Sequence, residues 1–265
     1  MERIGVYTLR TRIGEGGFGT VYQAEHSTLG VPACIKVNTR VSQADADFLR
    51  YEAQLLWQLD EYHSIPSIKD FISLNQKRGA LVMKLIEGET LEDVVEKKGP
   101  IHPEDVCWIT ERLLGALYYA HRHGVVHTDV KPQNIFIEPH KRDIKLIDFG
   151  LATYHPTSTT KPLGYSPRYA APELIAGNPP LPETDLYGAG LAMLRALGGD
   201  VAKKSFRPDT PSEIVDYCQK LIRYDPRDRP SWEKNNPLIT LSNIREKVFG
   251  RRHLEVSQVL KGGGQ

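Results

Sequence analysis

The stretch H-T-D-V-K-P-Q-N at residues 127–134, followed by D-F-G at residues 148–150, decides the fold of this 265-residue chain. It places two carboxylates, an amide and an ammonium in two short loops. Short apolar runs flank both loops and predict β-strands at residues 125–126, 135–137 and 144–147. Because strand–loop–strand segments can bring successive loops close together, the pattern predicts one polar site built from both loops.

The side chains of these loops suit phosphoryl transfer. Asp129 beside Lys131 can orient a hydroxyl nucleophile, and Asn134 and Asp148 offer the hard oxygen ligands that Mg²⁺ prefers. Transfer of a phosphoryl group from a nucleotide to an alcohol needs mainly positioning and charge stabilisation from the protein. The two loops therefore predict a phosphotransferase.

The two motifs, in this order, resemble the protein kinase family, whose catalytic loop reads H-R-D-L-K-P-x-N and whose metal loop reads D-F-G. The chain departs from that pattern at Thr128, in place of Arg, and at Val130, in place of Leu. Further matches run from about Gly14 to Arg229. The pattern is similar to eukaryotic-like Ser/Thr protein kinases, and residues 164–173 look similar to bacterial members.

Composition is that of a soluble globular protein, with 40% hydrophobic and 25% charged residues. The net charge of +1 favours neither nucleic acid nor an anionic membrane as a partner. Three distant cysteines give no disulfide or metal pattern and suit a reducing cytosol. The amino terminus lacks a signal-peptide run, and no stretch approaches the roughly 20 apolar residues of a membrane span. We therefore expect a cytoplasmic protein without a membrane segment or nucleic-acid partner.

The order of predicted elements indicates an α+β class. Strands are predicted at residues 7–13, 21–25, 32–37, 69–74 and 80–86, with one helix at 43–59. After Gly88 the expected helices are 91–97, 102–123, 186–197, 211–224 and 241–248. The resemblance implies a bilobal protein-kinase-like fold at 1–249, with a small β-rich N-lobe (about 1–86) and a larger helical C-lobe (about 87–249). Residues 250–265 read as a basic, Gly-rich tail.

The nucleotide-binding residues follow from the resemblance. The pattern G-x-G-x-x-G-x-V implies a phosphate-covering hairpin at Gly14, Gly16, Gly19 and Val21. Lys36, on a strand among apolar neighbours, would contact the α- and β-phosphates of ATP and pair with a helix Glu. Glu52 is the candidate because it lies mid-helix, whereas the alternative, Glu61, falls at the helix end.

An adenine slot needs apolar faces and backbone groups at its edge. By resemblance, Val21 and Cys34 form its roof and Phe136 its floor, although the family usually has Ala and Leu at the last two places. Met83 would be the gatekeeper, and the backbone of Lys84 and Ile86 would bond adenine.

The catalytic roles are also implied by the resemblance. Asp129 would orient the substrate hydroxyl, Lys131 would stabilise the transferring phosphoryl group, and Asn134 and Asp148 would bind Mg²⁺. His127 is expected to be structural, packed and hydrogen-bonded.

Thr128 cannot form the bidentate contact with a phosphate that Arg makes at this place in the family. We therefore expect activity that does not require phosphorylation of the activation segment, where residues 157–160 are all Ser or Thr. Structural supports are expected from a Glu173–Arg229 ion pair and from Asp185 beneath the catalytic loop. Residues 199–210 are too few for the helix that the family usually carries there.

The leading hypothesis is a Ser/Thr protein kinase that uses MgATP, phosphorylates protein substrates and also itself. One alternative is a pseudokinase that binds nucleotide or a partner without transfer. Another is a small-molecule kinase of similar fold, against which Glu173 and Arg229 argue.

Overall fold

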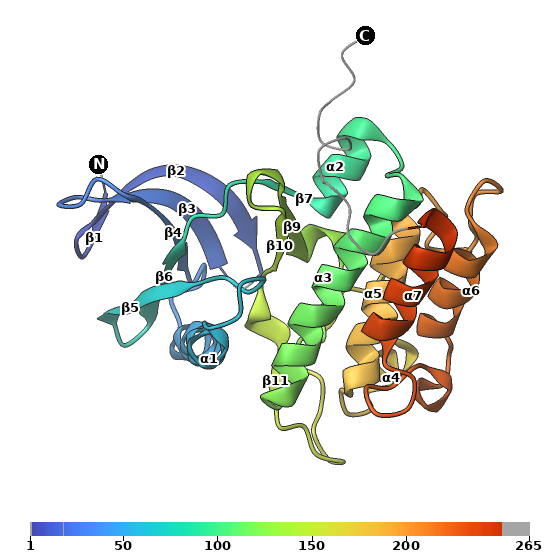
Figure 1. Ribbon diagram of the computed structural model, residues 1–265. Helices are drawn as coiled ribbons and strands as arrows, with labels where there is room; N and C mark the ends of the chain where they lie inside the picture. The colour runs from blue at the N-terminus through green and yellow to red at the C-terminus, as the bar shows by residue number, and fades with distance from the viewer. Residues whose placement is uncertain (1, 18, 251–265) are drawn as a thin grey trace, which may run out of the picture. The chain divides into compact units, whose positions relative to one another are not determined.

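The computed structural model describes residues 2–17 and 19–250, so the tail expected at 250–265 lies, apart from Gly250, outside the described residues. The chain forms two compact units. The first contains Met1–Glu87 together with Asp148–Gly150, and the second contains Gly88–Ile147 and Leu151–Gln265. The first is rich in strands and the second in helices, which confirms the α+β class and the kinase-like fold (Figure 1).

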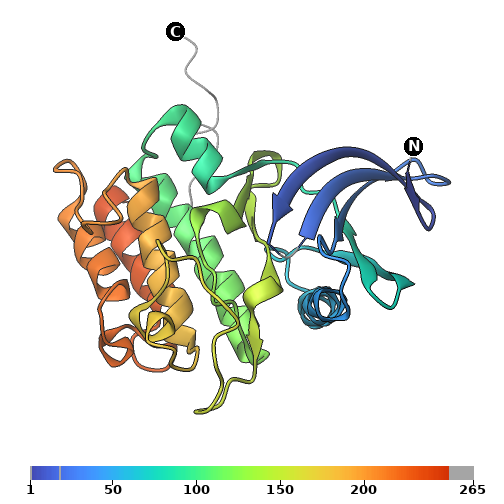
Figure 2. The same cartoon turned by 180° about the vertical axis from the view of Figure 1, so that it is seen from behind.

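The first unit is built on a six-stranded antiparallel sheet in the order β1-β2-β3-β4-β6-β5 (Figure 2). The strands are β1 (Arg3–Ile4), β2 (Tyr7–Gly16), β3 (Gly19–His26), β4 (Pro32–Val37), β5 (Ile68–Asn75) and β6 (Arg78–Lys84). Alternate side chains, among them Leu9, Ala24 and Ile35, form a buried cluster on one face. This alternation fixes which strand residues face the core.

Helix α1 (Gln43–Leu59) contacts β5 and β6. It begins at Ser42, whose side chain accepts a hydrogen bond from the backbone N–H of Asp45. Leu49, Ala53 and Leu56 are buried at helical spacing. Glu52 lies on the same buried face, so the helix carries a carboxylate among apolar side chains.

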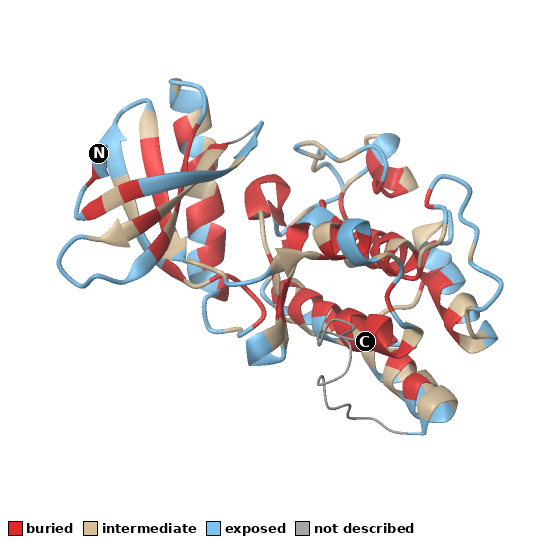
Figure 3. Cartoon of the chain, turned by 90° about the horizontal axis from the view of Figure 1, so that it is seen from above, coloured by how far each residue is buried: buried red, intermediate tan, exposed pale blue. Residues whose placement is uncertain are grey.

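The second unit is mainly helical and contains α2 (Leu91–Lys98), α3 (Pro103–Arg122), α4 (Pro172–Ile175), α5 (Pro182–Ala196), α6 (Ser212–Leu221) and α7 (Pro237–Phe249). Nearly every residue of α5 is buried, because α5 contacts α2, α3 and α6 (Figure 3). Helix α5 therefore provides a rigid support for the loops that it contacts.

Two small sheets shape the loops of the second unit. One has the order β10-β9-β7, from β7 (Glu89–Thr90), β9 (Ile135–Glu138) and β10 (Asp143–Leu146). The other pairs β8 (Val125–Val126) with β11 (Thr153–Tyr154). The catalytic loop runs between β8 and β9 and ends in a short 3₁₀ turn at Pro132–Asn134.

Most expected elements are present within a few residues of their predicted limits. The elements that the sequence patterns did not predict, β1, β7, β11 and α4, have two to four residues, too few for a periodic pattern. Residues 197–211 contain no helix; an isolated bridge joins Asp200 and Ser205 there. No helix among the described residues is long and apolar enough to cross a bilayer.

Candidate active site

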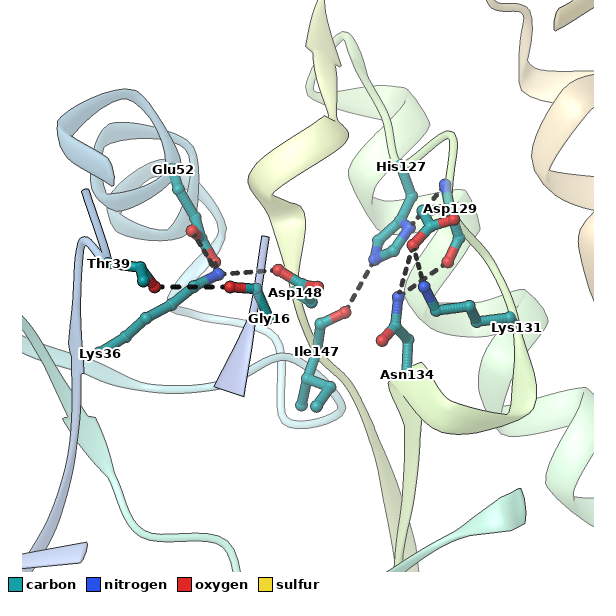
Figure 4. A network of polar contacts seen from close by, with 10 residues as sticks. All are labelled: Gly16, Lys36, Thr39, Glu52, His127, Asp129, Lys131, Asn134, Ile147 and Asp148. Atoms are coloured by element: carbon teal, nitrogen blue, oxygen red, sulfur yellow. Dashed lines mark hydrogen bonds and ion pairs between the residues drawn. The ribbon is translucent and has the colours of Figure 1, made fainter. Parts of the chain in front are cut away.

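A buried lysine of the first unit binds two carboxylates (Figure 4). Lys36 Nζ on β4 donates to Glu52 Oε1 at 2.9 Å, to Glu52 Oε2 at 2.8 Å and to Asp148 Oδ1 at 2.8 Å. Lys36 is 7% exposed and Glu52 3%, whereas the Asp148 side chain is 37% exposed. Lys36 therefore connects β4 with α1 and with the D-F-G segment. Its partner on α1 is Glu52, as expected, and not Glu61.

The charges of this cluster follow from its burial. Burial alone would lower the pKa of Lys36, but the charges and hydrogen bonds of Glu52 and Asp148 outweigh it and raise that pKa. Burial raises the pKa of Glu52, opposed by the lysine charge. With two carboxylates around one ammonium, the cluster can accept a further cation or exchange a carboxylate contact for an anion.

The glycine hairpin lies at the turn between β2 and β3. A side chain carbon at Gly19 would lie 2.9 Å from Lys36 Cγ and 3.0 Å from the Val37 carbonyl oxygen, so only glycine fits there without a shift. At Gly16 and Gly17 an added side chain carbon would meet no atom of another described residue within 4 Å, so there is open space beside both glycines. The Gly16 carbonyl accepts a hydrogen bond from Thr39 Oγ1 at 3.4 Å.

The residues expected around adenine divide between the two units. Cys34 pairs with Met83 across β4 and β6, and Val21 pairs with Lys36 across β3 and β4. Burial raises the pKa of the Cys34 thiol to about 11, so this thiol stays neutral at physiological pH.

The backbone N–H of Lys84 donates to the Ser67 carbonyl at 2.9 Å, so this N–H is already paired within the first unit. Ile86 follows β6 and is half-buried. Phe136, on β9 of the second unit, is half-buried.

In the second unit, three side chains of the catalytic loop contact Asp129 (Figure 4). Lys131 Nζ donates to Asp129 Oδ2 at 2.5 Å and to Ser166 Oγ at 2.7 Å. Asn134 Nδ2 donates to the Asp129 carbonyl at 2.9 Å and to Asp129 Oδ2 at 3.2 Å. His127 Nδ1 accepts the backbone N–H of Asp129 at 3.3 Å. The aspartate is therefore held from the side chains of its own loop.

His127 has the structural role that the sequence favoured. It is fully buried, and because Nδ1 accepts a hydrogen bond, Nε2 carries the proton and donates to the Ile147 carbonyl at 2.9 Å. Ile147 N–H donates in turn to the Asn134 carbonyl at 2.9 Å. These contacts fix the loop against the end of β10.

Asp185 on α5 accepts the backbone N–H groups of His127 and Thr128, both at 2.7 Å. Sequence reasoning missed two further members of this network. Trp232 Nε1 donates to His121 Nδ1 at 2.9 Å, so His121 Nε2 donates to Asp185 Oδ2 at 2.8 Å. No local motif marks His121 or Trp232, because their partners are distant in sequence.

The expected clamp between Glu173 and Arg229 is present. Arg229 Nη1 and Nη2 donate to the two oxygens of Glu173 at 2.7 and 2.8 Å, and the side chains are 0% and 6% exposed. The guanidinium also donates to the carbonyls of Glu183, Arg223 and Tyr224. This pair fixes α4 against the turn that precedes α7.

Comparison with known families agrees with this geometry. The family model described as protein kinase domain matches residues 7–237. The chain belongs to the protein kinase family. Several similar curated proteins are bacterial kinases. Serine/threonine-protein kinase PrkC of Bacillus subtilis is 32% identical over 226 residues, 78% of this chain and 34% of that protein.

Two further relatives are also named as bacterial serine/threonine-protein kinases. Serine/threonine-protein kinase PknL of Mycobacterium tuberculosis is 35% identical over 200 residues, 73% of this chain and 49% of PknL. Serine/threonine-protein kinase PkaA of Streptomyces coelicolor is 31% identical over 264 residues, 86% of this chain and 48% of PkaA. The chain thus spans between a third and a half of the length of these relatives.

Proposed function

We propose that this protein transfers the γ-phosphoryl group of MgATP to Ser and Thr hydroxyls of proteins, its own chain included. The observation that carries the proposal is the Asp129 cluster, in which Lys131 Nζ bridges the carboxylate and the Ser166 hydroxyl. Support comes from the kinase family match and from relatives named as serine/threonine-protein kinases.

Asp129 would accept a hydrogen bond from the substrate hydroxyl and aim its oxygen at phosphorus. As the bond from that oxygen to the γ-phosphorus forms, the bond to the β–γ bridging oxygen breaks, and ADP leaves. The hydroxyl proton passes to Asp129 Oδ2 or on to solvent. Lys131, already beside this oxygen, would stabilise negative charge on the phosphoryl group.

Lys36 would bind the α- and β-phosphates, with Glu52 holding the ammonium in place. Because an added side chain carbon at Gly16 or Gly17 would meet no other described residue, a phosphate would have room to approach these glycines. We further propose Val21, Cys34, Met83, Ile86 and Phe136 as the surroundings of adenine.

We also propose Asn134 and Asp148 as ligands of Mg²⁺, because amide and carboxylate oxygens are the donors that this cation prefers. The amide nitrogen of Asn134 is occupied by Asp129, and its Oδ1 accepts no hydrogen bond from another described residue. Asp148 adds a partly exposed carboxylate. When bound, Mg²⁺ would neutralise phosphate charge.

Cytoplasmic action is part of the proposal, because all three cysteines are free thiols in the described residues and two of them, Cys107 and Cys218, are buried.

The test is to incubate the protein with MgATP and casein, and to map phosphorylated residues by mass spectrometry, with D129N alongside. We expect phosphoserine and phosphothreonine on casein and on the protein itself, from the wild type alone. Nucleotide binding without transfer would indicate a pseudokinase. Transfer only to small alcohols would indicate a small-molecule kinase, and transfer only to tyrosine would contradict the Ser/Thr assignment.

A further inference from the structure

Thr128 has an unusual backbone conformation for its residue type. Its φ is +66°, in the left-handed region, where a β-branched residue is a genuine outlier. The residue is 5% exposed. Such a conformation persists only where the surrounding contacts hold it, and it is concentrated at functional positions.

Two short hydrogen bonds hold Thr128. Its backbone N–H donates to Asp185 Oδ1 at 2.7 Å, and its hydroxyl Oγ1 donates to the Leu151 carbonyl at 2.6 Å. The second bond leaves the catalytic loop and reaches the segment that follows D-F-G. Because Thr128 directly precedes Asp129, this bond links the catalytic loop to the segment that begins at Leu151.

The hydroxyl bond continues a backbone ladder. The backbone pairs Val126 with Thr153 and Val125 with Tyr154, and the N–H of His155 donates to the Gly124 carbonyl at 2.7 Å. If the same antiparallel register is extended by two residues beyond the Val126–Thr153 pair, Thr128 lies opposite Leu151. The backbone pairing of β8 and β11 ends at Val126, and a side chain makes the following link.

Leu151 passes this link to the far end of the segment. Its side chain packs closely on Gly164, where a side chain carbon would lie 3.1 Å from Leu151 Cδ2. Two residues later, Ser166 Oγ accepts the hydrogen bond from Lys131 Nζ at 2.7 Å. Both ends of residues 151–166 are thus tied to the catalytic loop.

We propose that Thr128 is a positioning residue whose hydroxyl, through Leu151, holds residues 151–166 in the arrangement that brings Ser166 to Lys131 and Asp129. The link contains no charged group. It therefore needs no phosphate on the segment, whereas an Arg at this place would need one for a bidentate contact. The kinetic part of this inference rests on the proposed kinase function; the structural part does not.

The test compares three variants. T128V removes the hydroxyl and keeps the β-branched shape, and T128S keeps the hydroxyl. T110V is the matched control, because Thr110 is 3% exposed and its Oγ1 donates to the Val106 carbonyl at 2.7 Å within α3, away from the segment. Each protein is assayed for kcat and for KM of ATP, and by hydrogen exchange of the backbone amides at residues 155–165.

In T128V we expect kcat to fall about tenfold, the factor that corresponds to one buried hydrogen bond, with KM for ATP unchanged. The amides of residues 155–165 should exchange about tenfold faster, because the opened segment is more populated by that factor. T128S should stay within about twofold of the wild type in both measurements, since it restores the bond. T110V should change neither.

Equal changes in T128V and T110V, or no rescue by T128S, would overturn the proposal. If the wild type transfers no phosphoryl group, the proposed function fails and the exchange measurement alone decides the positioning role. If T128V does not fold, T128A replaces it. If T128S folds and neither T128V nor T128A does, the bond serves the stability of the whole unit, and the proposal is overturned.

Discussion

Lys36 on β4 donates to both carboxylate oxygens of Glu52 on α1, at 2.9 and 2.8 Å, and both side chains are buried. A buried ion pair leaves an uncompensated charge when one partner is removed. Lys36 also contacts Asp148, so the position of α1 and that of the D-F-G segment both depend on one ammonium.

Substitution of Lys36 should therefore disable transfer. K36M should lower kcat about 10²–10³-fold, because a fixed charge that stabilises the phosphates is lost. The control is K69M, since Lys69 is exposed on β5 and, within the described part of the chain, donates only to the nearby Ser67 hydroxyl. Steady-state kinetics with ATP and casein measure both. Comparable activity of K36M and K69M would contradict the assigned role.

Asp129 should be needed for chemistry rather than for folding. D129N keeps the size of the side chain and its contact with Lys131, but it weakens the acceptor for the substrate hydroxyl. We expect kcat to fall about 10²–10⁴-fold, the usual contribution of such a group. Thermal unfolding should shift little. D216N, at an exposed position of α6, should leave kcat unchanged. A D129N enzyme with near-normal kcat would exclude Asp129 as the hydroxyl-orienting group.

Activity should not depend on phosphorylation of residues 157–160. Among residues 2–17 and 19–250, their hydroxyls bond only within this segment: Thr160 Oγ1 accepts the Thr157 N–H at 2.8 Å, and Thr157 Oγ1 lies 3.1 Å from Thr159 Oγ1. Replacing all four residues with Ala should keep kcat within about threefold, because exposed local hydrogen bonds contribute little. Loss of nearly all activity would show that a phosphate there is required.

The Glu173–Arg229 clamp should contribute strongly to stability. E173A leaves a buried guanidinium without its carboxylate and should lower the free energy of unfolding by about 3–5 kcal/mol. Arg227 and Asp225 form an exposed pair, so R227A should cost less than about 1 kcal/mol. Chemical denaturation of both variants provides the comparison. A similar loss of unfolding free energy in E173A and R227A would contradict the prediction that the buried pair contributes more to stability than the exposed pair.

Stability should depend on pH through Asp105 at the start of α3. Burial raises the pKa of its carboxyl from 3.8 to about 6, against the charges of His102 and Arg245 and with that of Glu104. The folded state thus binds this proton more tightly than the unfolded state, so Asp105 lowers stability progressively as pH rises from about 4 to about 6.

D105N removes this titration. Its melting temperature relative to the wild type should rise from about pH 4 to about pH 6 and then level off, because the Asp105 carboxyl is protonated in both the folded and unfolded states below that range and ionised in both above it. D216N, at an exposed position of α6, is the control for the loss of one carboxylate. A D105N difference that stays constant across this range would contradict the raised pKa. Calorimetry in buffers of matched ionic strength gives the measurement.

Local patterns explain how much could be predicted. The helix at Gln43–Leu59 and the strand at Pro32–Val37 have their predicted limits, because a cap at Ser42 and a short apolar run are encoded by adjacent residues. The same holds for the Asp129 cluster, where Lys131 and Asn134 are neighbours in sequence. Such short spacings leave the chain few alternatives.

Long-range partners could not be read from the chain. The ion pair of Glu92 and Arg195 joins residues 103 positions apart, and Trp232 reaches His121 across 111 positions. Neither pair has a motif, since their contact depends on how α2, α3 and α5 pack. Arg245, buried against Glu111, is another case, because an Arg in a terminal helix is usually exposed.

The sequence by itself determined the family, the class of fold and the candidate residues for the proposed chemistry, because these depend on residue type and on spacing within short loops. Tertiary structure alone decided that Thr128 takes a left-handed conformation and bonds the Leu151 carbonyl. That contact exists only after β8 and β11 pair, and hydrogen bonds between distant segments form only where packing has already brought donor and acceptor together.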